Sequence, residues 1–267
     1  MDPLRYPVII PVPSWYHDHA VGGRTVMPAV EIMLLLAAEA GKNRPGIRLG
    51  EMRQARFARF LEIPPAAPHL ELFVELSGRE GNRMRASLLS RRRLPAMTRL
   101  LEHARVEFSY SGAALRPGPR PGIRPEGQAE RAVPAATVYR QHVPFGPAYQ
   151  TLRDRLHLNG REAWGRMQAP RPPDDQGPAH ALGSPFPLDA AFHAACVHGQ
   201  QHVDFVPFPV GFSRRIIHRP TRPGQGYLVR AVLAGCSGGR LFYDLVIADM
   251  EGSCRETVLG VEMRRVL

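Results

Sequence analysis

Two segments far apart in the chain each place a titratable side chain at an apolar run. His19 is followed by Gly23 and Pro28 just before the first run, and Asp189 opens the second and precedes His193 by four residues. A histidine can accept a proton and a carboxylic acid can donate one, so a pair that meets in an apolar cleft can perform acid/base chemistry. We therefore predict that His19 and Asp189 face a common cleft.

The spacing within the second segment predicts a supporting role for His193. Residues at i and i+4 of a helix share one face, so His193 can hydrogen-bond to Asp189 and orient it. Burial in an apolar pocket would raise the pKa of Asp189, whereas a helix N-terminus would lower it, and the sequence leaves this open. It also leaves open whether Asp189 is only an N-cap.

Composition is that of a globular protein without a membrane span. The 267 residues can bury a sizeable core, as one large domain or two small fused ones. No apolar stretch approaches the roughly 18 residues of a membrane helix, and residues 1–16 lack the pattern of a secretory signal. The three cysteines (Cys196, Cys236 and Cys254) form no CxxC pair. We therefore expect free thiols and a cytoplasmic protein that does not bind membranes.

The charge of the chain is strongly positive and carried by arginine. The net charge is +11, and Lys42 is the only lysine among 35 basic residues. This arises from either a coding bias or an acidic or phosphorylated partner, whose oxygens match the arginine fork. No zinc finger, aromatic RNA-binding motif or basic helix is present, so we expect no nucleic-acid partner.

The pattern of apolar residues predicts one helix followed by several strands, given twice. Residues 116–134 are rich in Pro and Gly and predict a linker. The expected elements before it are a helix at 29–40 that stops at Gly41 and strands near 53–61, 70–76, 84–89 and 104–110. Those after it are strands at 151–158 and 162–168, a helix at 188–201 and strands near 212–218, 227–233, 241–248 and 257–266.

A helix that is apolar nearly all round is usually buried, and a sheet wrapped around such a helix is a hotdog unit. The repeated pattern predicts a duplicated α+β fold, a double hotdog. The expected boundaries are 1–115 for the N-terminal hotdog, 116–134 for the linker and 135–267 for the C-terminal hotdog.

Three motifs carry a resemblance to a known family. The segment from His19 through Gly23 to Pro28 resembles the HxxxGxxxxP motif of polyketide synthase dehydratase domains, and Gly146-Pro147-Ala-Tyr-Gln-Thr-Leu is similar to their GPxxxxL motif. Asp189-x-x-x-His193 resembles their third motif, and the three occur in the family's order. The resemblance implies a double hotdog that removes water from a β-hydroxyacyl thioester on an acyl carrier protein in polyketide or fatty-acid-like biosynthesis.

The resemblance also implies roles and partners. His19 would be the base, Asp189 the acid and His193 a supporting catalytic residue, with no metal and no cofactor beyond the carrier's phosphopantetheine. The carrier protein and other polyketide synthase components would be partners. The family allows a homodimer, and the chain would be either free-standing or a domain excised from a synthase.

The remaining motif residues are expected to shape the substrate site. The amide of Gly23 would donate to the thioester carbonyl, and Pro28 would open the following helix. Gly146 and Pro147 would form a tight turn beside the pocket, near Tyr149. The family usually has a tyrosine before the Gly-Pro pair, whereas this chain has Phe145. The substrate-binding set is therefore Gly23, Pro28, Phe145, Gly146, Pro147 and Tyr149.

Three alternatives remain open on the sequence alone. The same His/Asp pair could isomerise a double bond or cyclise a polyketide, as product-template domains do. A non-catalytic module that docks a carrier protein is a second reading, supported by the basic charge. A zinc site built from the histidines at 17, 19, 198 and 202 is a third, although HGQQH lacks the glutamate of HExxH.

Overall fold

The computed structural model describes residues 3–79, 82–93, 97–110, 122–171 and 182–266. In this part of the chain, one antiparallel sheet of 12 strands has the order β1-β5-β6-β7-β4-β11-β14-β13-β12-β10-β9-β8. The strands of the first half are β1 (Leu4–Pro11), β4 (Ile47–Phe57), β5 (His69–Arg79), β6 (Arg83–Arg93) and β7 (Thr98–Tyr110). Those of the second half are β8 (Arg131–Pro134), β9 (Leu152–Leu158), β10 (Glu162–Gln168), β11 (Phe208–Ile217), β12 (Gly226–Ser237), β13 (Arg240–Asp249) and β14 (Cys254–Arg264).

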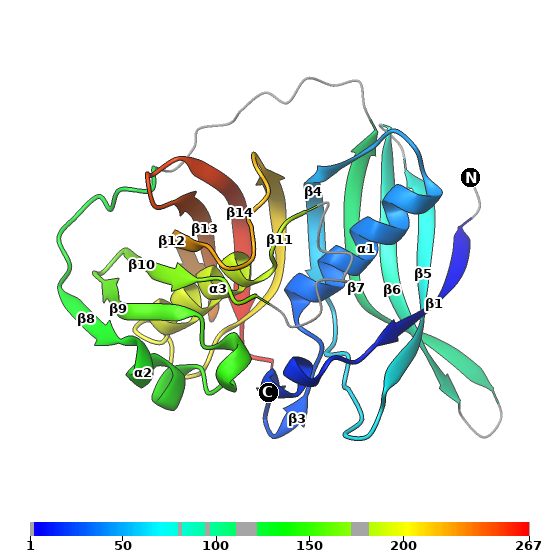
Figure 1. Cartoon of the computed structure of the whole chain (residues 1–267), viewed down its shortest axis with the longest axis horizontal. Helices are drawn as coiled ribbons and strands as arrows, with labels where there is room; N and C mark the ends of the chain where they lie inside the picture. The colour runs from blue at the N-terminus through cyan, green and yellow to red at the C-terminus, as the bar shows by residue number, and fades with distance from the viewer. Residues whose placement is uncertain (1–2, 80–81, 94–96, 111–121, 172–181, 267) are drawn as a thin grey trace.

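The sheet order demonstrates the duplication. In each half the four strands that follow the long helix take the order second, third, fourth, first, and the two first strands, β4 and β11, pair with each other at the centre. The strands of one half contact α1 (Ala29–Asn43), and those of the other contact α3 (Phe186–Gly199). Figure 1 shows the two halves side by side, each with its helix. The predicted double hotdog is confirmed.

The central helices are buried because they are apolar on most or all faces. Every residue of α3 is buried, including Asp189, His193 and His198. Eight residues of α1 are buried, and this helix contacts the strands of its own half as well as α3. In the described part of the chain, no helix combines the length and apolarity that a membrane crossing requires.

Short elements of both halves lie at one end of the molecule (Figure 1). A 3-10 turn (Ser14–Asp18) leads into a hairpin of β2 (Ala20–Val21) and β3 (Arg24–Thr25). The short helix α2 (Ala135–Thr137) continues as a wider turn (Val138–His142), and a second 3-10 turn covers Pro147–Tyr149.

Several element boundaries differ from those expected. Helix α1 continues past Gly41 to Asn43, whose side chain hydrogen-bonds to the carbonyl and carboxylate of Glu39. Strand β4 starts at Ile47 and ends at Phe57, so residues 58–61 lie outside it. Helix α3 begins two residues before the expected position 188 and ends at Gly199.

Two edge strands were not expected. Strand β1 contains Pro7, which has no backbone N–H to donate. It is tolerated because β1 lies at the edge of the sheet and pairs only with β5. Strand β8 occupies 131–134, the end of the predicted linker, and pairs with β9. Residues 116–121 of that linker lie outside the described residues.

Candidate active site

His19 is held between the first 3-10 turn and the β2–β3 hairpin. The hairpin reverses through Gly22 and Gly23, whose φ angles of 58° and 75° suit the two-residue turn that glycine favours. The turn brings Val26 back to His19, so that the Val26 amide donates to the His19 carbonyl over 3.0 Å. The Nδ1 atom of His19 lies 2.9 Å from the Val26 carbonyl oxygen.

This contact determines the tautomer of His19. A carbonyl oxygen only accepts, so Nδ1 carries the proton and donates it, and Nε2 is left bare. The ring stacks on Phe145 with centroids 4.3 Å apart, and Tyr149 packs edge-on at 5.1 Å. Burial among these rings lowers the pKa of His19 to about 4, opposed in part by the Val26 hydrogen bond. His19 is therefore neutral at pH 7, with Nε2 free to accept a proton.

Asp189 is the fourth residue of α3, and it is not an N-cap. The N-cap position belongs to Pro185, and no side chain caps this helix. Asp189 is 5% exposed, and its Oδ2 atom has no hydrogen-bond partner. Burial raises the pKa of Asp189 well above its ordinary value, and the nearby Glu31 carboxylate raises it further. Burial therefore outweighs the helix N-terminus and favours the protonated acid form of Asp189.

His193 lies one turn along α3 from Asp189. Its Nε2 atom is 3.1 Å from Asp189 Oδ2, but neither atom has a partner that meets the angular requirements of a hydrogen bond. The predicted contact is present, and the predicted hydrogen bond is not. Burial, followed by the charge of His19, lowers the pKa of His193 to about 3. We interpret the pair as a neutral acid beside a neutral imidazole, because burial disfavours the ion pair.

Unpartnered buried polar atoms are costly and uncommon, and each calls for an explanation. Here Asp189 Oδ2 and both ring nitrogens of His193 are unpartnered. A cavity of about 760 Å³ is lined by these two residues together with His19, Phe145 and Cys196. The structure thus brings His19 from the first half and Asp189 and His193 from the second half to one cavity, of a size usual for a ligand site.

The other predicted substrate-binding residues lie outside the lining of this cavity. They are Gly23, Pro28, Gly146, Pro147 and Tyr149. Pro28 is the N-cap of α1 and not a residue of its first turn. Tyr149 is fully buried, and its hydroxyl has no partner among the described residues. Their contact with substrate stays a prediction, whereas Phe145 lines the cavity directly.

Asp18 joins the two sequence motifs, a role that was not predicted. Its carboxylate accepts from the Ala148 amide over 2.8 Å, and its carbonyl accepts from the Gly146 amide over 2.7 Å. A Cβ atom at Gly146 would lie 2.5–2.7 Å from the Asp18 side chain, so any other residue would force Asp18 to shift. The residue just before His19 thereby fixes the Phe145–Tyr149 segment against the imidazole.

Glu31 is a second unpredicted residue near the site. It lies in the first turn of α1, and its side chain accepts a hydrogen bond from Tyr16. Burial raises the pKa of Glu31 to about 7, and this bond lowers it in part. Its charge favours the protonated form of Asp189.

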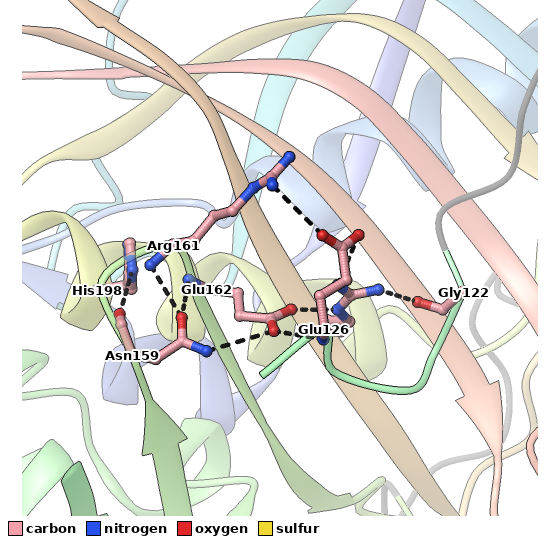
Figure 2. A network of polar contacts seen from close by, with 7 residues as sticks. Gly122, Glu126, Asn159, Arg161, Glu162 and His198 are labelled. Carbon is pink, nitrogen blue, oxygen red and sulfur yellow. Dashed lines mark hydrogen bonds and ion pairs between the residues drawn. The ribbon is translucent and has the colours of Figure 1, made fainter. Parts of the chain in front are cut away.

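His198 belongs to a separate structural network. Its Nδ1 lies 2.8 Å from the Tyr243 hydroxyl and its Nε2 lies 3.0 Å from the Asn159 carbonyl, so both ring nitrogens are engaged. Figure 2 shows this network continuing from Asn159 to Glu162, which pairs with the buried Arg230. Within the described ranges, no three metal-ligating side chains gather at one point.

Comparison with known proteins agrees with the resemblance. The family model described as the polyketide synthase dehydratase N-terminal domain matches residues 117–267, more than half of the chain. A comparison with curated proteins gave no significant match.

Solved structures with the same fold are distant in sequence. A trans-AT polyketide synthase dehydratase domain from Brevibacillus brevis is 16% identical, with a TM-score of 0.76 over 99% of this chain and 94% of that one. The dehydratase domain from the CurF module of curacin polyketide synthase is 18% identical, with a TM-score of 0.75 over 99% and 93%. An N-terminal dehydratase from the difficidin assembly line is 15% identical, with a TM-score of 0.73 over 99% and 94%. With its double hotdog fold and the match of the family model, this chain belongs to the polyketide synthase dehydratase family.

Proposed function

We propose that this protein removes water from a 3-hydroxyacyl thioester carried on the phosphopantetheine of an acyl carrier protein. One observation carries the proposal. The bare Nε2 of the neutral His19 and the unpartnered carboxylic acid of Asp189 come from different halves and line one cavity. A base and an acid with opposite pKa shifts are the two groups that an elimination needs.

In the proposed reaction, His19 Nε2 takes the α-proton of the thioester. The electron pair of that C–H bond becomes the α,β double bond, and the β C–O bond breaks as Asp189 protonates the leaving oxygen. Water departs, leaving a protonated His19 and an ionised Asp189. Return of the proton from the imidazole to the carboxylate, through solvent, restores both groups.

The surrounding residues support these two roles. Phe145 excludes water from one face of the His19 ring and keeps the base neutral. The Phe145 ring centroid also lies 5.1 Å from that of His193, so one aromatic side chain contacts both imidazoles. The proposed role of His193 is to orient the Asp189 acid; the 3.1 Å contact between its Nε2 and Oδ2 supports this role, although the contact is not a hydrogen bond in the free protein. The Gly23 amide remains the proposed donor to the thioester carbonyl.

Arginines at the rim of the cavity support a carrier protein as partner. Arg59 and Arg264 are exposed, line the cavity and make no ion pair with any described residue. Arg24 also lines the cavity, but its guanidinium is paired with Glu62 at 2.7 Å. We therefore propose that Arg59 and Arg264 contact the acidic carrier or its phosphate. The KM for a carrier-bound substrate should rise with ionic strength, and a KM independent of salt would contradict this assignment.

The test is incubation with 3-hydroxyacyl carrier protein, followed by mass analysis for loss of water. His19→Ala and Asp189→Asn should each slow dehydration by about 10²–10⁴-fold. The double variant should lose much less than the product of the two effects, because both groups act in one elimination. His193→Ala should cost less than either single change.

Two surface variants serve as matched controls. His202→Ala and Asp154→Asn change exposed residues that do not line the cavity, and both should dehydrate at the wild-type rate. Near-normal turnover by His19→Ala would refute the proposed base. A product isomerised or cyclised without loss of water would refute dehydration and leave the pair with a different reaction.

A further inference from the structure

A second pair of polar side chains lines the same cavity and has no part in the proposed elimination. The Ser90 hydroxyl oxygen lies 2.7 Å from Nε2 of His103, and both residues are part of the cavity wall. His103 is buried, with 6% of its surface exposed, and Ser90 is half-buried.

A bulge in the sheet places His103 there. On strand β7, Ala104 pairs with Leu88 and Glu102 pairs with Leu89, so His103 is an extra residue without a partner on β6. Bulges re-aim side chains and are frequent beside functional sites. The His103 carbonyl accepts from the amides of residues 58 and 59, over 2.8 and 3.3 Å, just beyond the end of β4.

The hydrogen bonds of His103 determine what Ser90 offers to a ligand. Nδ1 of His103 lies 3.1 Å from the Phe60 carbonyl oxygen, which only accepts, so Nδ1 carries the proton. Burial lowers the pKa of His103 and keeps the ring neutral. Nε2 is therefore an acceptor, and Ser90 must donate its hydroxyl proton to it. No described residue donates to the Ser90 oxygen, so its lone pairs are available to a donor in the cavity.

The pair lies beside the arginine rim. The Phe60 ring packs against Phe208 with centroids 6.1 Å apart, and Phe208 pairs with Arg264 between β11 and β14. The Arg59 amide contacts His103 itself. A chain that enters past these arginines therefore meets Ser90 as an oriented acceptor on the cavity wall.

We infer that Ser90, oriented by His103, is a binding subsite for an amide N–H of the carrier's pantetheine arm. The inference rests on the proposed function, which supplies the arm. A pantetheine thioester presents two secondary amides along an otherwise flexible chain. Ser90 would hold the outer of these amides while the thioester reaches His19 and Asp189, and His103 would act only by orienting Ser90.

The test measures binding and does not depend on turnover. Butyryl-pantetheine has no β-hydroxyl and cannot lose water, so its affinity can be measured by calorimetry. Ser90→Ala should weaken binding by about 3–10-fold, the usual value of one neutral hydrogen bond. The loss should be smaller for the N-acetylcysteamine thioester, which lacks the outer amide. Ser90→Thr keeps the hydroxyl and should restore most of the affinity.

Ser87→Ala is the matched control, because Ser87 lies on the same strand, bonds to Glu102 and does not line the cavity. It should bind both thioesters as the wild type does. Equal affinities in wild type and Ser90→Ala, or equal losses for both thioesters, would overturn the subsite. Release of free thiol that depends on Ser90 would also overturn it, in favour of acyl transfer to serine. A wild-type protein that does not dehydrate the 3-hydroxyacyl substrate, but still binds butyryl-pantetheine more tightly than Ser90→Ala does, would refute the proposed reaction and leave the subsite standing.

Discussion

The low pKa of His19 makes a quantitative prediction for the acid limb of the pH–rate profile. An imidazole with the ordinary pKa of about 6.5 is only about 9% neutral at pH 5.5. With a pKa of about 4, His19 is about 97% neutral at that pH. Lowering the pH from 7.5 to 5.5 should therefore leave the kcat/KM of the free enzyme nearly unchanged.

The assay is initial-rate dehydration between pH 4 and 9, with the acid limb centred near pH 4. A tenfold fall in kcat/KM between pH 7.5 and 5.5, with the protein still folded, would refute the buried neutral base. On the alkaline side, kcat/KM should fall as Asp189 ionises, well above the ordinary pKa of an aspartate. Asp189→Asn should remove that alkaline limb.

Folding must be monitored at each pH, because the same burial makes the protein acid-sensitive. The unfolded chain protonates His193 near pH 6.5, whereas the folded chain resists protonation down to about pH 3. Stability is therefore lost as the pH falls below 6.5, by about 1.4 kcal/mol at pH 5.5 for this one residue. Circular dichroism separates this loss from titration of the base.

Phe145→Ala tests whether burial against the Phe145 ring is what lowers the pKa of His19. Removing the stacked ring should hydrate one face of His19, raise its pKa towards 6.5 and move the acid limb upward. An unchanged limb in this variant would show that Phe145 does not keep the base neutral.

Three further predictions concern residues around the site. Asp189→Asn should raise the unfolding free energy at pH 7, because the raised pKa of Asp189 makes its ionisation less favourable in the folded chain than in the unfolded one. Below about pH 3.8 the unfolded chain also holds the proton, so the gain should disappear; urea titrations that give the same gain at both pH values would contradict this. Gly146→Ala should lower the unfolding free energy by about 1–3 kcal/mol, and lower kcat, because its methyl group clashes with Asp18. Gly160→Ala, whose methyl group meets nothing within 4 Å, should leave both unchanged, and equal melting temperatures for the two variants would contradict this. His198→Ala should lower the unfolding free energy by about 2–5 kcal/mol, because the Tyr243 hydroxyl and the Asn159 carbonyl lose their hydrogen-bond partner. Turnover per folded molecule should be unchanged, and a reduced value would contradict a purely structural role.

Local patterns predicted the elements that carry a strong period. The alternation from Leu70 to Leu76 predicted β5, because a strand that packs on the core has one apolar face. The two apolar runs predicted α1 and α3, because a helix enclosed by a sheet is apolar on most of its faces. The two edge strands, β1 and β8, were not predicted because both contain proline, which is unfavourable in a central strand. An edge strand tolerates the missing backbone N–H.

The sequence predicted which residues form the site better than it predicted their contacts. The motifs marked His19, Asp189 and His193, but nothing in the sequence connected Asp18 with Ala148, 130 residues apart. The bulge at His103 was equally hidden, because a single extra residue on one strand becomes visible only when its pairing partner is known.

The sequence by itself determined the duplicated helix-and-sheet pattern and the residue types that could act as acid and base. Only the tertiary structure decided the direction of their pKa shifts. Asp189 experiences both a helix N-terminus, which lowers its pKa, and burial, which raises it, and the balance depends on how completely the two halves exclude water. The same enclosure lowers the pKa of His19, so the opposite shifts of the two groups arise from one cavity that neither half forms alone.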